Sequence, residues 1–128
     1  PIRDVAVHGD QVIVLTTNDH AEGSGLRLLD LDGQFLRTIA AGQFRDPYAV
    51  TASHGRAFVV DVDVDVYDDV VYTRKVLFVI DIQSGDVSQR VRVDIQCNVS
   101  AILVDGDEIF IAGSDKAVVV LQLAGSEA

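Results

Sequence analysis

An internal repeat is the feature of this sequence that most restricts its fold, because three marks recur along the chain in the same order. The first mark is a short strand that ends in a glycine turn, at residues 5–9, 49–55 and 102–106. The second is an apolar triplet shortly after that glycine, at residues 12–14, 58–60 and 109–111. The third is a strand that closes on another glycine turn, at residues 28–33, 79–85 and 120–125. Repeats of roughly 40–50 residues indicate stacked supersecondary units.

Each unit reads as strand, turn, strand, loop, strand and turn, and a fourth strand follows in the first two units at residues 34–39 and 86–93. Glycine suits these turns because tight hairpins need positive φ. Continuous apolar triplets, rather than alternation, indicate strands that are buried on both faces. Four antiparallel strands per unit, with the units stacked face to face, predict an all-β chain of the β-propeller type.

We expect residues 1–128 to form a single propeller-like segment of about three blades. The first blade covers residues 4–42, the second residues 48–94 with an inserted hairpin at 61–76, and the third residues 99–124 without its outer strand. Closed propellers have about four to eight blades, so three blades leave two apolar faces bare, and such faces call for a partner. The partner is either the rest of a longer propeller or a second copy that completes a six-bladed ring. A β-sandwich is the alternative fold.

The charge of the chain excludes some classes of partner. Its 128 residues include 20 acidic and 10 basic ones, which gives a net charge of −10. This balance repels phosphate groups, so we expect neither nucleic acid nor an anionic membrane as the main partner. The longest apolar run is far shorter than the roughly 20 residues of a membrane helix, which predicts a soluble chain. The single cysteine allows no internal disulfide and slightly favours a cytoplasmic location.

The stretch that joins the first two units resembles the NHL-repeat propellers. Residues 28–39 (LLDLDGQFLRTI) are similar to the family's "vFd-x-x-G-x-fl" segment, residues 43–50 (QFRDPYAV) to its "F-x-x-P-x-g-v" start, and residues 55–61 (GRAFVVD) to its "G-x-iyVaD" strand. The resemblance covers about one repeat unit, and the first and third units lack the proline. It implies a six-bladed propeller that binds protein or another ligand. The RNA-binding and metal-dependent lyase activities of some relatives are not carried over, because this chain has neither a basic face nor a histidine-rich channel.

The sharpest local feature is the alternating run of aspartate and valine at residues 61–69 (DVDVDVYDD). Carboxylates at the first, third, fifth and ninth positions have the spacing of a loop that wraps oxygen ligands around Ca²⁺. The four candidate ligands are Asp61, Asp63, Asp65 and Asp69. The run resembles the calcium loops of some integrin-like propellers, but Val66 stands in place of their turn glycine and resists positive φ.

The alternative for the same run is an extended hairpin with Asp68-Asp69 at its tip. Strict alternation would place four valines on one face, namely Val60, Val62, Val64 and Val66. The aspartates would then face water or meet Arg74 and Lys75 across the hairpin. Both interpretations stay open at this point.

The inserted hairpin, the loop at residues 18–25 and the turn at residues 114–116 occupy the same place in their units. Insertions on a repeat scaffold usually lie on one rim and carry its specificity, so we predict an acidic binding rim. The candidate rim residues are Asp19, Glu22, Asp65, Tyr67, Asp68, Asp69 and Asp115. His8 and His54 both precede a turn glycine and are interpreted as polar turn residues rather than ligands.

No acid, base or nucleophile set and no phosphate or dinucleotide fingerprint is recognisable in the sequence, so we name no catalytic residue. We therefore expect a non-enzymatic binding or scaffolding module whose acidic rim and exposed blade faces contact a protein, a peptide or another copy. One alternative is a calcium-binding propeller segment with a structural ion in the 61–69 loop. The other is a fragment of a propeller enzyme whose site is completed by further blades. Apart from Ca²⁺, we expect no cofactor.

Overall fold

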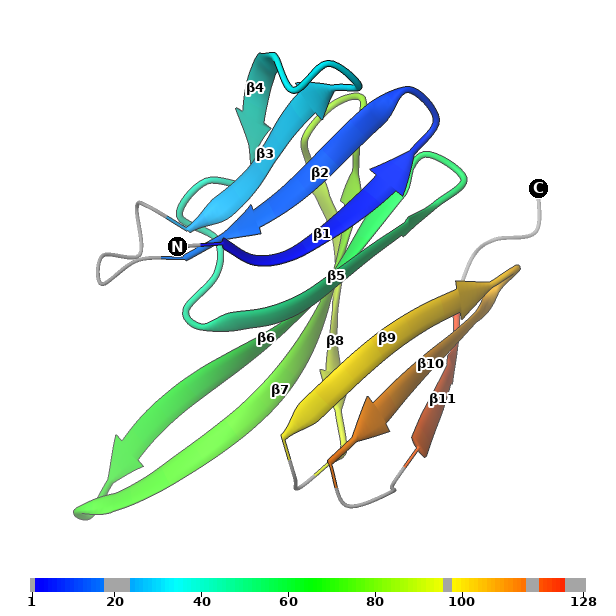
Figure 1. Cartoon of the computed structure of the whole chain (residues 1–128). Helices are drawn as coiled ribbons and strands as arrows, with labels where there is room; N and C mark the ends of the chain where they lie inside the picture. The colour runs from blue at the N-terminus through cyan, green and yellow to red at the C-terminus, as the bar shows by residue number, and fades with distance from the viewer. Residues whose placement is uncertain (1, 18–23, 96–97, 115–117, 124–128) are drawn as a thin grey trace.

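The computed structural model describes residues 2–17, 24–95, 98–114 and 118–123, and these residues form strands, turns and loops (Figure 1). The expectation of an all-β chain is confirmed. Among the described residues there is no helix, and hence none of the length and apolar character needed to cross a membrane.

The strands form three antiparallel sheets that follow one another along the chain. Sheet 1 contains β1 (Ile2–His8), β2 (Gln11–Thr16), β3 (Gly25–Asp30) and β4 (Phe35–Ile39) in that order. Sheet 2 contains β5 (Pro47–Ser53), β6 (Arg56–Tyr67), β7 (Val70–Asp81) and β8 (Val87–Val93) in that order. Sheet 3 contains β9 (Val99–Asp105), β10 (Glu108–Gly113) and β11 (Val118–Gln122), with β10 in the middle. Each sheet is thus a simple meander.

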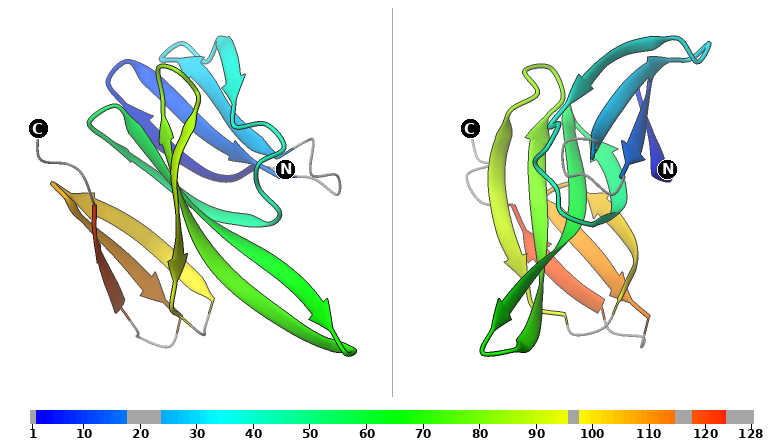
Figure 2. Two further views of the ribbon diagram at one scale, coloured as in Figure 1. Left: turned by 180° about the vertical axis from the view of Figure 1, so that it is seen from behind. Right: turned by 90° about the vertical axis from the view of Figure 1, so that its left-hand side faces the viewer.

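Sheet 2 lies between the other two sheets in space as well as in sequence (Figures 1 and 2). The first strands of the three sheets form the line of contact, because β5 lies beside both β1 and β9. These three strands run in the same direction in Figure 1. The sheets therefore succeed one another around a common edge made of first strands.

Two apolar clusters hold the stack together. The first joins sheet 1 to sheet 2, and its largest buried side chains are those of Ile13, Leu15, Leu26, Leu28, Phe44, Phe78 and Ile80. The second joins sheet 2 to sheet 3 through Phe58, Val60, Leu77, Val79, Ile109 and Ile111. Full burial of one such side chain contributes about 1.5–3 kcal/mol. The β6 triplet is apolar throughout because Val59 enters the first cluster while Phe58 and Val60 enter the second.

A hairpin extends from sheet 2 beyond its neighbouring strands. β6 and β7 stay paired from Arg56–Asp81 to Tyr67–Val70, whereas β5 pairs only as far as Asp61 and β8 only as far as Lys75. Residues 62–74 are therefore a two-stranded projection, visible at the lower left of Figure 1. We call these residues the arm.

Candidate binding surfaces

The tip of the arm carries three of the predicted rim residues. Tyr67 ends β6, and Asp68 and Asp69 form the turn with φ of 51° and 62°. Two successive positive φ values are those of the hairpin turn that matches strand twist, and aspartate tolerates them better than most residues. The hairpin interpretation of this run is the conformation that the structure shows.

Apolar side chains are exposed along the arm, next to its acidic ones. The exposed apolar and aromatic residues are Val64, Val66, Tyr67, Val70, Val71 and Tyr72. The predicted rim residues Asp19, Glu22 and Asp115 lie outside the described residues, and the structure describes the backbone of Asp65 but not its side chain. The described part of the predicted rim is therefore the arm tip alone.

Asp61, the first of the predicted calcium ligands, is a buried anchor with an exposure of 2%. Its Oδ1 accepts hydrogen bonds from the backbone N–H groups of Arg45 at 3.1 Å and Asp46 at 2.8 Å, and its Oδ2 accepts from Arg45 at 3.0 Å. Burial raises the pKa of the Asp61 carboxyl above its usual value, and the hydrogen bonds from backbone donors oppose that shift without cancelling it. Asp61 thus fixes the loop that leads into β5.

Of the other predicted calcium ligands, Asp69 lies far from Asp61. The Oδ1 of Asp63 lies 3.2 Å from Nε of Arg45 and also accepts the backbone N–H of Val64. Asp69 is at the arm tip, and the extended run of seven residues from Asp61 to Tyr67 rises by roughly 20 Å. In the part of the chain that the structure describes, no group of three or more His, Cys, Asp or Glu side chains could hold a metal ion. Calcium binding stays a prediction.

The strand pairing in the arm places Arg74 and Lys75, the two basic residues expected to meet the aspartates, on opposite faces of the hairpin. Asp63 pairs with Arg74, whereas Lys75 pairs with Val62. Because side chains alternate between the two faces of a strand, Lys75 points to the face opposite the acidic row. Its side chain is buried in sheet 2.

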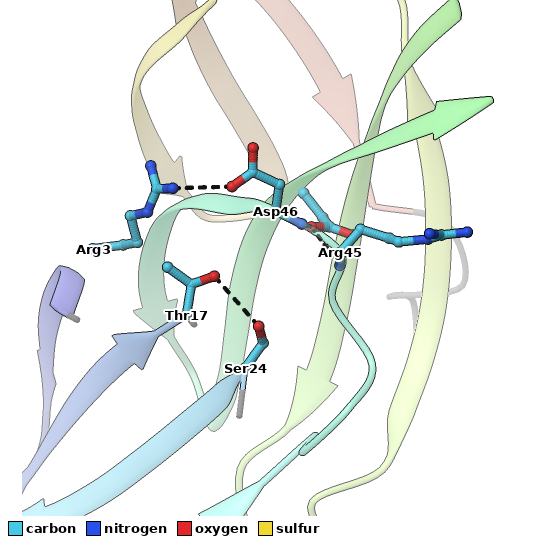
Figure 3. Close-up of polar contacts among 6 residues, drawn as sticks. Arg3, Thr17, Ser24, Arg45 and Asp46 are labelled. Carbon is cyan, nitrogen blue, oxygen red and sulfur yellow. Dashed lines mark hydrogen bonds and ion pairs between the residues drawn. The ribbon is translucent and has the colours of Figure 1, made fainter. Parts of the chain in front are cut away.

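The loop before β5 is the joint between sheets 1 and 2. Phe44 is buried and meets Phe78 edge-on, with ring centroids 5.1 Å apart. Asp46 pairs with Arg3 of β1 at 3.0 Å, and Figure 3 shows the two side chains pointing toward each other. The Arg3 guanidinium also lies 5.2 Å from the Tyr48 ring centroid. One short loop therefore contacts β1, β6 and β7.

His8 and His54 have different places in the structure, although both precede a glycine. His8 is the last residue of β1, and its Nε2 accepts the backbone N–H of Gly55 at 2.9 Å. His54 is itself a turn residue with φ of 51°. The prediction of a turn position is therefore right for His54 and wrong for His8, whose side chain bridges sheets 1 and 2. An open cavity of about 680 Å³ lies beside both histidines and also borders Arg37 and Asp81.

The first turns of the three sheets give a common register. The flanking pairs are His8–Gln11, Ser53–Arg56 and Asp105–Glu108. On the third strand of each sheet, residues at the same distance from these pairs are equivalent. One such set is Leu26, Leu77 and Val118, and another is Leu28, Val79 and Val120. The first two members of each set are buried in the junction with the next sheet, whereas the members from sheet 3 are exposed.

The outer face of sheet 3, here called outer face 3, is thus an uncovered version of the faces buried at the two junctions. Its apolar residues are Ala101, Leu103, Phe110, Ala112, Val118 and Val120. Asp105 and Glu108 are exposed at its turn end. The opposite side of the sheet, with Ile109 and Ile111, is buried against sheet 2.

The outer face of sheet 1, here called outer face 1, is the counterpart at the other end of the stack. Its apolar residues are Val5, Val7, Val12, Val14, Leu29 and Phe35, of which Val5, Val7 and Phe35 are exposed and Val14 is buried. Their equivalents in sheet 2 include Val50, Ala52, Val59 and Ile80, which all pack in the first cluster. The charged residue of outer face 1 is Arg27, whose guanidinium lies 5.0 Å from the Phe35 ring centroid.

Sequence reasoning predicted two bare faces without naming their residues. The repeat contained the information needed to name them. Residues at the same distance from the first turn of each sheet are equivalent, and this equivalence identifies the side chains that no further sheet covers.

No family model matches this chain, and no curated protein matches it. Among solved structures, the chain is similar to the computationally designed Ika4 protein. The TM-score is 0.50 and the sequence identity 16%, over 97% of this chain and 92% of that chain. A likeness at this identity concerns the fold alone, so it adds an independent example of this arrangement of sheets. The resemblance to NHL repeats stays a prediction.

Proposed function

We propose that the three sheets are consecutive β-propeller blades and that the chain is a non-enzymatic association module whose outer faces bind protein. One observation carries the proposal: outer faces 1 and 3 expose apolar side chains at the positions that form the two buried clusters. Contiguous apolar patches on both ends of a stack are typical of contact surfaces, because leaving them in water forgoes the free energy of burial.

The proposed architecture explains why the first strands meet along one edge. In a propeller the first strand of each blade lines the central axis, and successive blades pack face to face around it. The contacts of β5 with both β1 and β9 agree with that arrangement. Three blades in a row leave one face uncovered at each end, and these are outer faces 1 and 3.

The arm is a separate contact surface, suited to a partner other than a second copy of this chain. Its exposed Val66 and Tyr67 lie beside the Asp68-Asp69 tip, so it offers apolar area next to acidic side chains. Aromatic residues on a projecting element are common anchors at protein interfaces. A partner for the arm would carry apolar and basic side chains.

Covalent footprinting tests whether the outer faces are contact surfaces, and the arm supplies an internal reference. Val7 and Leu103 on the two faces and Val71 on the arm are each 63% exposed, so they should label alike in an isolated chain. We expect Val7 and Leu103 to become protected as protein concentration rises, while Val71 keeps its labelling. Equal labelling of all three at every concentration up to about 1 mM, a limit set by weak association, would contradict the proposal.

A further inference from the structure

The two outer faces carry apolar side chains at the positions that meet at an internal junction. At the first junction, Ala6 of β1 and Ala52 of β5 both pack against the first cluster. Their equivalents in the common register are Leu103 on outer face 3 and Val7 on outer face 1. Sheet 3 followed by another sheet 1 would therefore make a third junction of the same kind.

We infer that the occupant of both outer faces is a second copy of this chain, which closes a six-sheet ring with it head to tail. The inference rests on the association proposed above and names its partner. Each copy carries both halves of the junction, so outer face 3 of each covers outer face 1 of the other. Such heterologous contacts close into a ring when the rotation per copy divides a full turn. Six blades are within the usual range for propellers.

Charge favours the head-to-tail contact over contacts between like faces. Outer face 1 carries the cation of Arg27, whereas outer face 3 carries the carboxylates of Asp105 and Glu108. Opposed potentials select the correct pairing, and like charges brought face to face disfavour the wrong one.

A charge-swap experiment tests this contact. In Val7→Glu, every junction between identical copies contains a buried unpaired carboxylate, and in Leu103→Lys every junction contains a buried unpaired ammonium. When the two variants are mixed, one junction is unaltered and the other pairs Glu with Lys. Val71→Glu on the arm is the matched control, since Val71 has the same exposure as the other two residues but lies outside both faces.

Sedimentation equilibrium measures the outcome. We expect the wild-type chain and Val71→Glu to have twice the 13.8 kDa chain mass. Each face variant alone should be monomeric, with its dimer dissociation constant raised at least about 100-fold. The equimolar mixture should recover a dimer with one copy of each variant, within about tenfold of the wild-type dissociation constant. Val5→Glu and Val120→Lys, each at a position 49% exposed, repeat the test if a first variant fails to fold.

Several results would overturn the head-to-tail ring. A dimer that only one of the two face variants disrupts would be a contact between like faces, and a mass that grows without limit would be an open chain of copies. Either result would leave at least one outer face protected in the footprint, so the association proposal would stand. A wild-type chain that stays monomeric, with Val7 and Leu103 labelled as fully as Val71, would overturn both.

Discussion

Sheet 2 and the sheets that flank it share one register, yet equivalent side chains in them have opposite surroundings. Leu77 of β7 is 1% exposed, whereas Val118, its equivalent on β11, is 60% exposed. On the other side of the stack, Val50 is buried and its equivalent Val5 is exposed. The difference lies in the neighbours, because sheet 2 has a sheet on each side and the flanking sheets have one each. The same pattern of residues thus builds a core in one place and an exposed apolar surface in another.

Truncation of Leu77 and of its equivalent Val118 should give the largest difference in unfolding free energy. Leu77→Ala opens a cavity between sheets 2 and 3, which costs about 2–5 kcal/mol of unfolding free energy. Val118→Ala removes methyl groups from an uncovered face, and in the monomer we expect a cost of about 0.5 kcal/mol or less. Urea unfolding measures the cost of each substitution when it is made in Val7→Glu, the variant that we expect to be monomeric. Equal costs would mean that outer face 3 is covered in solution even in that variant.

The second contrast is between two aspartates on one face of β6. Asp61→Ala removes the acceptor of the Arg45 and Asp46 backbone N–H groups in a buried setting, at a cost of about 1–3 kcal/mol. Asp63→Ala breaks a partly exposed ion pair with Arg45 and an exposed hydrogen bond from the Val64 backbone N–H, and should cost about 0–1 kcal/mol. Chemical denaturation of the two variants gives the ranking. The reverse ranking would show that the Asp63–Arg45 ion pair stabilises the chain more than the buried hydrogen bonds of Asp61 do.

The pH dependence of the Asp61 contribution is a smaller effect with a definite sign. The pKa of Asp61 in the folded chain lies above its ordinary value of 3.8, because burial disfavours the carboxylate. The folded state therefore binds the proton more tightly than the unfolded state does, and this group contributes most at low pH.

The contribution is lost as pH rises through the folded-state pKa, so the unfolding free energy of wild type minus that of Asp61→Asn should fall from pH 4 toward pH 7. Urea titrations at stepped pH measure this difference. A difference that rises over the same interval would contradict the assigned direction.

Calcium should have the smallest effect on the arm and the joint. A Ca²⁺ concentration of about 5 mM exceeds the dissociation constants of weak protein sites. At this concentration we expect an unchanged thermal midpoint, since Asp61 and Asp63 already have protein partners. Melting curves with Ca²⁺ and with a chelator make the comparison. A rise in the midpoint that the chelator reverses and Asp69→Asn abolishes would establish the calcium loop in place of a plain hairpin.

Much of the secondary structure could be predicted from the order of residues. Gly9, Gly55 and Gly106 have positive φ, and each is one of the two turn residues of a hairpin that the repeat indicated. The alternation at residues 61–67 and the paired aspartates after it pointed to a hairpin, with its tip at Asp68-Asp69. These features could be read because hairpin turns and strand alternation depend on residues that are close in sequence.

The role of Asp61 could not be read in the same way. Its spacing from Asp63 suits a metal loop and an extended strand equally well, and nothing nearby in the chain distinguishes them. The deciding contacts come from Arg45 and Asp46, which precede it by more than a dozen residues. The same is true of His8, whose partner Gly55 belongs to the next sheet.

Turns, strand periodicity and the repeat itself are local properties, since they follow from the φ preferences and branching of adjacent residues, and the chain order alone specifies them. Burial is not local: Leu77 and Val118 occupy equivalent strand positions, and only the presence or absence of an adjoining sheet makes one a core residue and the other a surface residue. The hydrophobic effect acts on area removed from water, whichever segment removes it. For that reason the repeat predicted two bare faces, whereas the residues that make them up emerged only from the packing of the three sheets.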